Sequence, residues 1–277
     1  MYPRGNQKCI KFVYYLKMNV YVVCLCFISC SLARRLTITG GDVAVPHAYP
    51  YQVAIRINDD QFCGGSLISA NFVLTAAHCV NRENLSLDII LGAHNISDTE
   101  TTQIHRTSAN IIVHEEFDDI SFQNDIALIK LDEPAPITSA IQTIPLISET
   151  QADDPFTNEY VTVTGWGLIK DVFNPTIKDI SKVLMVLNGT VMLLDDCKKY
   201  YDGDYFSSIV YITNNNICTN GDDQKGTCSG DSGGPLVWDN VQIGIVSAGT
   251  GLCQIGAPSV FTHVGKYLDW IKKYVDV

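Results

Sequence analysis

The chain has 277 residues, of which 46% are hydrophobic and 18% are charged. This composition supports a packed core and excludes an intrinsically disordered chain, and the length fits one large domain or two small ones. The formal net charge of −11 excludes nucleic-acid binding as the default function, because phosphate recognition requires a basic surface.

The first 37 residues differ from the rest of the chain in charge and hydropathy. They hold six of the 19 basic residues and none of the 30 acidic ones, so the remaining chain has a net charge of −17. A basic segment, an apolar run over residues 20–30 and a small-x-small site ending at Ala33 predict a secretory signal peptide over residues 1–33. Met18 is an alternative start, because the segment after it is already a short signal.

The alternative to a signal peptide is a membrane anchor. The apolar run is shorter than the ~20 residues that span a bilayer, so the sequence favours secretion and no stable membrane association. Cleavage after Ala33 would leave residues 34–37 as a short pro-segment and residues 38–277 as the body.

The body keeps an even number of cysteines, as expected of a secreted protein with disulfides, although six cysteines allow 15 pairings. The six are Cys63, Cys79, Cys197, Cys218, Cys228 and Cys253. Three Asn-x-Ser/Thr triplets are candidates for glycosylation on the secretory route, at Asn84, Asn95 and Asn188.

Short β-type runs separated by Gly, Asn, Asp and Pro dominate the body, which is typical of β-sandwiches and barrels. The predicted strands cover residues 51–57, 65–68, 87–91, 126–131, 160–164, 182–187, 235–238, 242–247 and 259–262. A helical period occurs only at residues 264–275, and residues 133–158 are interpreted as a link between two halves.

Three segments carry chemistry when they are taken together. They are Leu74–Cys79, which contains His78; Asn124–Leu128, which contains Asp125; and Gly230–Pro235, which contains Ser232. Glycines around a serine allow a sharp turn that exposes its hydroxyl, while nearby backbone amides can face a reacting oxygen. Histidine accepts and returns protons near neutral pH, and a serine hydroxyl needs such a base.

With these segments, the chain resembles the trypsin/chymotrypsin family of serine proteases, and is most similar in appearance to secreted arthropod chymotrypsin-like digestive enzymes. The resemblance covers residues 38–277 and includes Ile38–Gly41 and Thr164–Gly167. It implies an all-β fold of two antiparallel six-stranded barrels, at about 38–140 and 155–262, with a C-terminal helix at about 264–275 and the active site in the cleft between the barrels.

The resemblance also implies a role for each site residue. Ser232 would be the nucleophile, His78 the general base, and Asp125 the group that orients His78. The backbone amides of Gly230 and Ser232 would form the oxyanion hole. A new amine at Ile38, released by cleavage of a zymogen, would pair with Asp231.

By the same resemblance, the disulfides would be Cys63–Cys79, Cys197–Cys218 and Cys228–Cys253. Gly226, Gly249 and Ser259 would form an open, uncharged specificity pocket. We expect it to receive the aromatic or large apolar residue before the cut bond, called P1.

Other residues of the resemblance have two interpretations or depart from the family pattern. Phe122 borders the neighbouring subsite or is a plain core residue, and the long loop between Cys197 and Cys218 adds substrate contacts or is a solvated insertion. Ala248 stands where the family usually has Trp, which thins a substrate-binding wall.

Two further departures concern metal binding and activation. Ala93 and Gln103 replace the two glutamates of calcium-binding members, so no calcium, other metal or cofactor is expected. Thr37 precedes Ile38, where an activating cut would usually follow Arg or Lys.

The predicted function is therefore a secreted serine endopeptidase of digestive type, with protein or peptide substrates, protein inhibitors as further partners, no nucleic-acid partner and a monomeric state. The alternatives are a catalytically inactive binding protein on the same fold and a cascade-processing protease.

Overall fold

The computed structural model describes residues 41–58, 60–203, 210–250 and 252–276. The predicted signal peptide, the pro-segment and Ile38 lie outside the described residues. Within the described part of the chain, no helix is long and apolar enough to cross a membrane.

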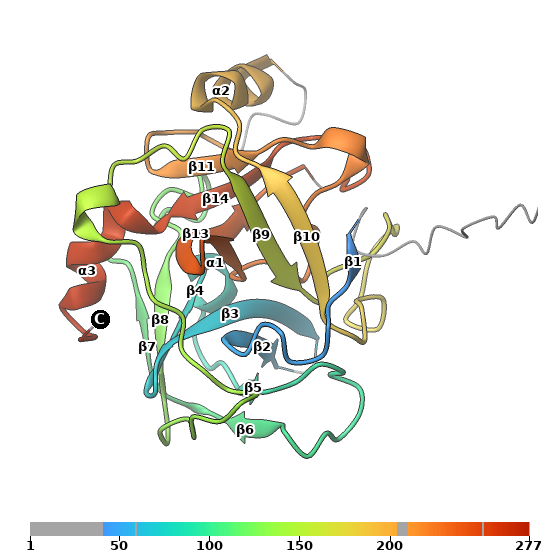
Figure 1. Cartoon of the computed structure of the whole chain (residues 1–277), viewed down its shortest axis with the longest axis vertical. Helices are drawn as coiled ribbons and strands as arrows, with labels where there is room; N and C mark the ends of the chain where they lie inside the picture. Colours follow the sequence, from blue (N-terminus) through green and yellow to red (C-terminus); the bar gives the residue numbers. More distant parts are fainter. Residues whose placement is uncertain (1–40, 59, 204–209, 251, 277) are drawn as a thin grey trace, which may run out of the picture. The chain divides into compact units, whose positions relative to one another are not determined.

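Seven antiparallel strands from the first half of the body form one curled sheet (Figure 1). Its strand order is β6-β5-β2-β3-β4-β8-β7. Only Thr107 separates β6 from β7, yet the two strands lie at opposite edges, so one continuous stretch of chain closes the sheet. The strands are β2 (Gln52–Ile57), β3 (Gln61–Ser69), β4 (Phe72–Thr75), β5 (Leu87–Leu91), β6 (Ile104–Arg106), β7 (Ser108–Val113) and β8 (Ala127–Leu131).

The second antiparallel sheet has the order β1-β10-β9-β12-β13-β14-β11. Its first strand comes from the start of the body and pairs with β10. The strands are β1 (Asp42–Val43), β9 (Tyr160–Gly165), β10 (Met185–Thr190), β11 (Asn216–Thr219), β12 (Pro235–Trp238), β13 (Val241–Ala248) and β14 (Ser259–His263).

The predicted all-β architecture of two curled antiparallel sheets is confirmed, but the expected six strands in each are seven. In the first sheet the additional strand arises because Thr107 divides one stretch of chain into two strands, β6 and β7. In the second it arises because the short β1 joins from outside that half. The strand predicted at residues 182–187 lies further along the chain, at β10.

Few helices accompany the strands in the described part of the chain. They are α1 (Ala77–Val80), α2 (Leu194–Gly203) and α3 (Leu268–Lys272), and short 3-10 turns cover Glu149–Gln151, Asp222–Gln224 and Val264–Tyr267. The predicted C-terminal helix is therefore present, but its first turn is a 3-10 turn and its last regular residue is Lys272. His263 caps this turn by accepting a hydrogen bond from the amide of Gly265.

The two sheets share one hydrophobic core, in which Leu74 and Ile129 of the first belong to the same cluster as Ile245 and Phe261 of the second. Buried polar contacts cross the same boundary. Ser66 donates to the side-chain oxygen of Gln242 at 2.6 Å, and Thr164 donates to that of Gln52 at 2.5 Å. These two buried contacts join the sheets through side-chain hydrogen bonds in addition to the shared core.

Candidate active site

The imidazole of His78 and the carboxylate of Asp125 form a hydrogen-bonded pair at the boundary of the sheets. His78 lies in α1, directly after β4, and Asp125 lies just before β8, the strand that pairs with β4. His78 Nδ1 lies 2.7 Å from Asp125 Oδ2, and the His78 amide donates to Oδ1 at 2.9 Å. Two bonds from one residue fix both the position and the ring orientation of the histidine.

Two residues of the second sheet hold the Asp125 side. Ser247 in β13 donates its hydroxyl hydrogen to Asp125 Oδ2 at 2.6 Å, and Thr262 in β14 donates to the Asp125 carbonyl at 2.8 Å. Sequence reasoning missed Ser247, because a serine at the end of a predicted strand gives no signal of its own. The buried carboxylate is thus supported from both sheets.

Ser232 lies on a tight turn that leads into β12. Gly230 has a φ of +98° and Gly233 one of +80°, values at which a side chain is strained. A Cβ on Gly233 would also meet the Thr75 hydroxyl at 2.2 Å. The Ser232 carbonyl accepts a hydrogen bond from the amide of Gly64 at 2.7 Å, which ties the turn to the first sheet.

The turn leaves two backbone donors for a reacting oxygen. Within the described part of the chain, the amides of Gly230 and Ser232 donate to no other protein group. Both residues line the first cavity at this boundary, together with His78. A hydroxyl beside a carboxylate-paired imidazole, with free amides nearby, can attack a carbonyl and stabilise the resulting oxyanion.

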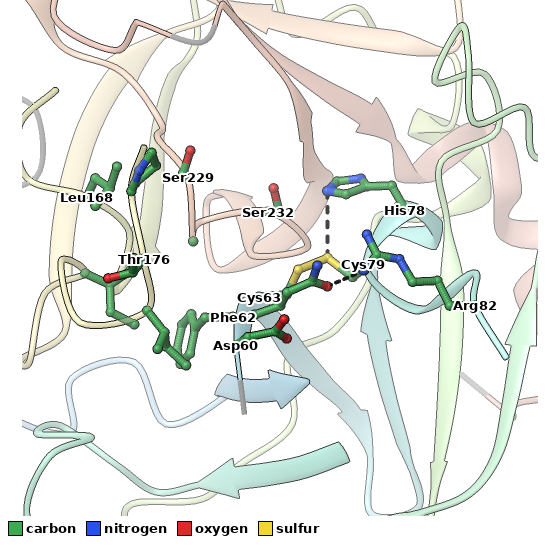
Figure 2. A pocket seen from close by; sticks show the side chains of 15 residues that line it. Asp60, Phe62, Cys63, His78, Cys79, Arg82, Leu168, Thr176, Ser229 and Ser232 are labelled. Carbon is green, nitrogen blue, oxygen red and sulfur yellow. Dashed lines mark hydrogen bonds between the residues drawn. A yellow bond between two sulfur atoms is a disulfide. The ribbon is translucent and has the colours of Figure 1, made fainter. Parts of the chain in front are cut away.

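Two cavities extend from His78 and Ser232 in different directions. The first has a volume of about 280 Å³ and is lined by Phe62, the Cys63–Cys79 disulfide and Leu168. Figure 2 shows His78 and Ser232 side by side at its edge, with Arg82 on the side of the first sheet. The second has a volume of about 370 Å³ and is lined by Gly249, one of the three residues predicted to form the P1 pocket.

The second cavity is bordered by the segments 227–229 and 246–250 and by Cys253. Gly249 lines it, and a Cβ at that position would meet no atom within 4 Å. Gly226 and Ser259 lie together behind the lining, where the Ser259 hydroxyl accepts a hydrogen bond from the amide of Thr227 at 3.0 Å. No Asp or Glu is among the described residues that line this cavity.

Ala248 has an apolar neighbour that the sequence did not identify. Val210, in the loop after α2, lines the second cavity, as Phe122 does, and packs in the same cluster as Ala248. The Phe122 ring lies 5.4 Å from the His78 ring in an edge-to-face arrangement. Gln123 joins the two loops by donating to the Tyr211 carbonyl at 2.5 Å. The side of the cavity next to the P1 region is therefore apolar.

Asp231 is fully buried behind the turn, and burial raises the pKa of its carboxyl to about 6. Its oxygens accept hydrogen bonds from the amides of Gly167 at 2.8 Å and Cys228 at 2.9 Å, which partly oppose this shift. A Cβ on Gly165 would meet the carboxylate at 2.2 Å, so glycine there leaves the room that Asp231 occupies.

The structure contains the three disulfide pairs that the family resemblance implies. Cys63–Cys79 ties β3 to α1, Cys197–Cys218 ties α2 to β11, and Cys228–Cys253 ties the Ser232 turn to the loop before β14. Two clusters bring His or Asp close to cysteines, namely Cys63, His78 and Cys79, and Asp171, Cys228 and Cys253. Their sulfurs are all disulfide-bonded, so they cannot provide thiolate ligands to a metal.

The loop Gly92–Gln103 is closed by protein groups. The Glu100 carboxylate accepts hydrogen bonds from the amides of His94 at 2.7 Å and Asn95 at 3.1 Å. The Gln103 side-chain amide donates to the Asn95 carbonyl at 2.8 Å and to Glu100 at 3.2 Å. The Gln103 amide therefore joins two oxygen atoms of this loop.

The three candidate glycosylation sites differ in their surroundings. Asn84 is exposed, Asn188 accepts a hydrogen bond from Thr162 at 2.9 Å, and Asn95 donates its side-chain amide to Asp98 at 2.6 Å.

Known proteins match the chain over most of its length. The trypsin family profile matches residues 38–271. Brachyurin from Leptuca pugilator is 42% identical over 85% of the chain and 97% of its own length. Chymotrypsin from Phaedon cochleariae is 36% identical over 86% of the chain and 82% of its own length. The 1.7 Å structure of HL collagenase superposes with a TM-score of 0.74 at 33% identity, covering 87% of the chain and all of that structure.

Proposed function

The chain belongs to the trypsin family of serine endopeptidases, and we propose that it is a secreted member that cuts peptide bonds after aromatic or large apolar residues. The observation that supports this preference most directly is the cavity beside Ser232, which no described acidic side chain lines. A substrate Lys or Arg would be desolvated there without a partner, whereas an aromatic P1 side chain gains roughly 1.5–3 kcal/mol from burial.

In the proposed mechanism, Ser232 attacks the peptide carbonyl while His78 takes the hydroxyl proton at Nε2. Asp125 holds Nδ1 and stabilises the imidazolium that forms. The amides of Gly230 and Ser232 stabilise the oxyanion, a type of donor worth about 3–4 kcal/mol in comparable enzymes. His78 then protonates the leaving amine, and water releases the acyl group from Ser232.

We further propose that the chain is made as a zymogen. A cut before Ile38 would release an amine that pairs with Asp231. Burial disfavours a lone carboxylate at this position, and a cationic partner would offset that cost. Because Thr37 precedes Ile38, the activating cut follows a residue other than Arg or Lys, or residues 36–37 are trimmed afterwards. Mass spectrometry of the native protein identifies the mature N-terminus, and a fully active chain beginning at Leu36 would refute this proposal.

The test of the P1 preference is profiling with an unbiased peptide library, using the chain cut to begin at Ile38 and a Ser232→Ala control. We expect cleavage after Phe, Tyr, Trp, Leu and Met that the control lacks. Cleavage after Lys or Arg would contradict the pocket assignment and leave the catalytic assignment intact. No cleavage, with a verified N-terminus and no labelling by a fluorophosphonate, would favour the inactive binding protein.

The extracellular location and the digestive role belong to the same proposal. The apolar leader and the disulfides support secretion, and a broad P1 preference suits digestion better than a processing cascade. A single preferred cleavage sequence in the library would instead favour the cascade role.

A further inference from the structure

An aspartate outside the triad ties two loops together behind the cavity assigned to P1. Asp171 lies between β9 and β10, whereas Cys253 and Gln254 lie between β13 and β14. Asp171 Oδ1 accepts a hydrogen bond from the amide of Cys253 at 2.7 Å, and Oδ2 accepts one from the amide of Gln254 at 3.4 Å. The Gln254 side-chain oxygen accepts a hydrogen bond from the Asp171 amide at 3.2 Å.

The backbone that Asp171 holds is part of the cavity wall. Cys253 lines the cavity and is joined by a disulfide to Cys228, which also lines it. A Cβ on Gly226 would lie 3.8 Å from the Cys253 carbonyl oxygen, so the Cys253 backbone lies next to Gly226, the residue predicted for the floor of the pocket. Hydrogen bonds to a carboxylate are stronger than those between neutral groups, and one carboxylate here orients two successive amides.

We propose that Asp171 is a positioning residue for the specificity cavity, because it sets the Cys253 wall at the place where a large P1 side chain contacts it. This inference rests on the proposed function, since it assigns a role within the P1 site. The disulfide fixes only the side chain of Cys253. Without the Asp171 carboxylate, the backbone amide of Cys253 would have no hydrogen-bond acceptor. A small P1 side chain such as alanine does not reach this wall, so its cleavage does not depend on Asp171.

The same segment of chain provides a matched control. Asp179 also accepts two hydrogen bonds, from the amide of Thr176 at 2.9 Å and from its hydroxyl at 2.8 Å. These contacts are local, and Asp179 does not line the second cavity, although its partner Thr176 lines the first. Asp171→Ala and Asp179→Ala therefore remove the same group from one segment, and only the first change releases the Cys253 wall.

The experiment measures kcat and KM for peptides that differ only at P1, which is either the residue preferred by the wild-type enzyme or alanine. In Asp171→Ala we expect kcat/KM for the preferred large residue to fall about tenfold, mainly through KM, as for the loss of one charge-assisted hydrogen bond. The alanine peptide should change by less than about twofold. Asp171→Asn, which keeps one acceptor, should lie between the wild type and Asp171→Ala, and Asp179→Ala should keep the wild-type ratio between the two peptides.

Two results would overturn the proposal. One is an Asp171→Ala variant whose ratio between the two peptides equals that of the wild type and of Asp179→Ala. The other is an equal loss on both peptides together with a lower Tm, which indicates a structural role only. A wild-type preference for Lys or Arg would instead refute the proposed P1 class, and the same ratio measured with that residue would still test Asp171.

Discussion

At the residue scale, Asp125 is a carboxylate with no exposed surface that accepts three hydrogen bonds. The Ser247 hydroxyl and His78 Nδ1 share its Oδ2 atom, so Ser247 helps to orient the oxygen that holds the imidazole. A hydrogen bond to a charged group contributes about 1.5–3 kcal/mol. When the Ser247 hydroxyl is removed, part of this free energy should be added to the activation barrier of the reaction.

We therefore expect Ser247→Ala to lower kcat about tenfold while KM changes little. Steady-state kinetics with a peptide substrate measure this, and Ser66→Ala is the matched control. Ser66 is also buried and donates a 2.6 Å hydrogen bond, but to Gln242, away from His78. An equal kcat loss in both variants would mean that Ser247 acts only through stability.

Val210 gives a second prediction at this scale, because it lines the second cavity and packs in the same cluster as Ala248. We expect it to contact the substrate residues before P1. Val210→Ala removes two methyl groups from an apolar surface, a loss of roughly 1.5 kcal/mol. Peptides with apolar residues at P2 to P4 should lose about tenfold in kcat/KM. An ester substrate that ends at P1 should be unaffected, and an equal loss on that ester would contradict this role.

At the scale of elements, the Glu100 carboxylate holds the loop at residues 92–103 through hydrogen bonds from His94, Asn95 and Gln103. Burial tends to raise the pKa of Glu100, but the hydrogen bonds from His94, Asn95 and Gln103 outweigh it, so the net pKa is lowered. A lowered pKa means that this stabilisation is present above the ordinary pKa of glutamate and is lost as the pH falls through the lowered one.

We expect a chelator to leave Tm unchanged and Glu100→Ala to destabilise the fold by about 1–3 kcal/mol. Thermal unfolding at pH 7 with and without EDTA measures both effects. Glu83→Ala, a change at an exposed site before the loop, is the control. A Tm that falls on adding EDTA would show that a bound cation holds the loop.

The elements show what sequence patterns can and cannot predict. The strand at residues 87–91 was predictable because its hydrophobic run is short and bounded by polar residues. β7 was missed because its residues are at most partly buried and its apolar residues run together at its end instead of alternating with polar ones. α2 was missed because its sequence, Leu194–Gly203, is mostly polar, and its packing depends on Cys197 and Tyr201. Val210, Asp171 and Ser247 make contacts with residues that are far away in the sequence. A local sequence pattern therefore cannot predict these contacts.

At the scale of the whole molecule, we expect Asp231 to link the state of the N-terminus to the stability of the fold. Its carboxyl has a pKa of about 6 in the folded chain, against an ordinary value of 3.8. Between these values the folded state keeps a proton that the unfolded state has released. The resulting stabilisation is fully present below the ordinary pKa and is lost as the pH rises through about 6.

The uncut Ser232→Ala chain should therefore lose stability between about pH 4 and 6.5 in a way that Ser232→Ala/Asp231→Asn does not. The asparagine cannot ionise, so at pH 7 the double variant should have the higher Tm. Cutting the Ser232→Ala chain to begin at Ile38 should remove this part of the pH dependence, because the new amine supplies a cation to the buried carboxylate. Thermal unfolding of the three proteins across this pH range measures the difference. Parallel curves for the two uncut proteins would show that the Asp231 carboxyl is not what couples pH to stability, and unchanged behaviour after the cut would argue against its pairing with Ile38.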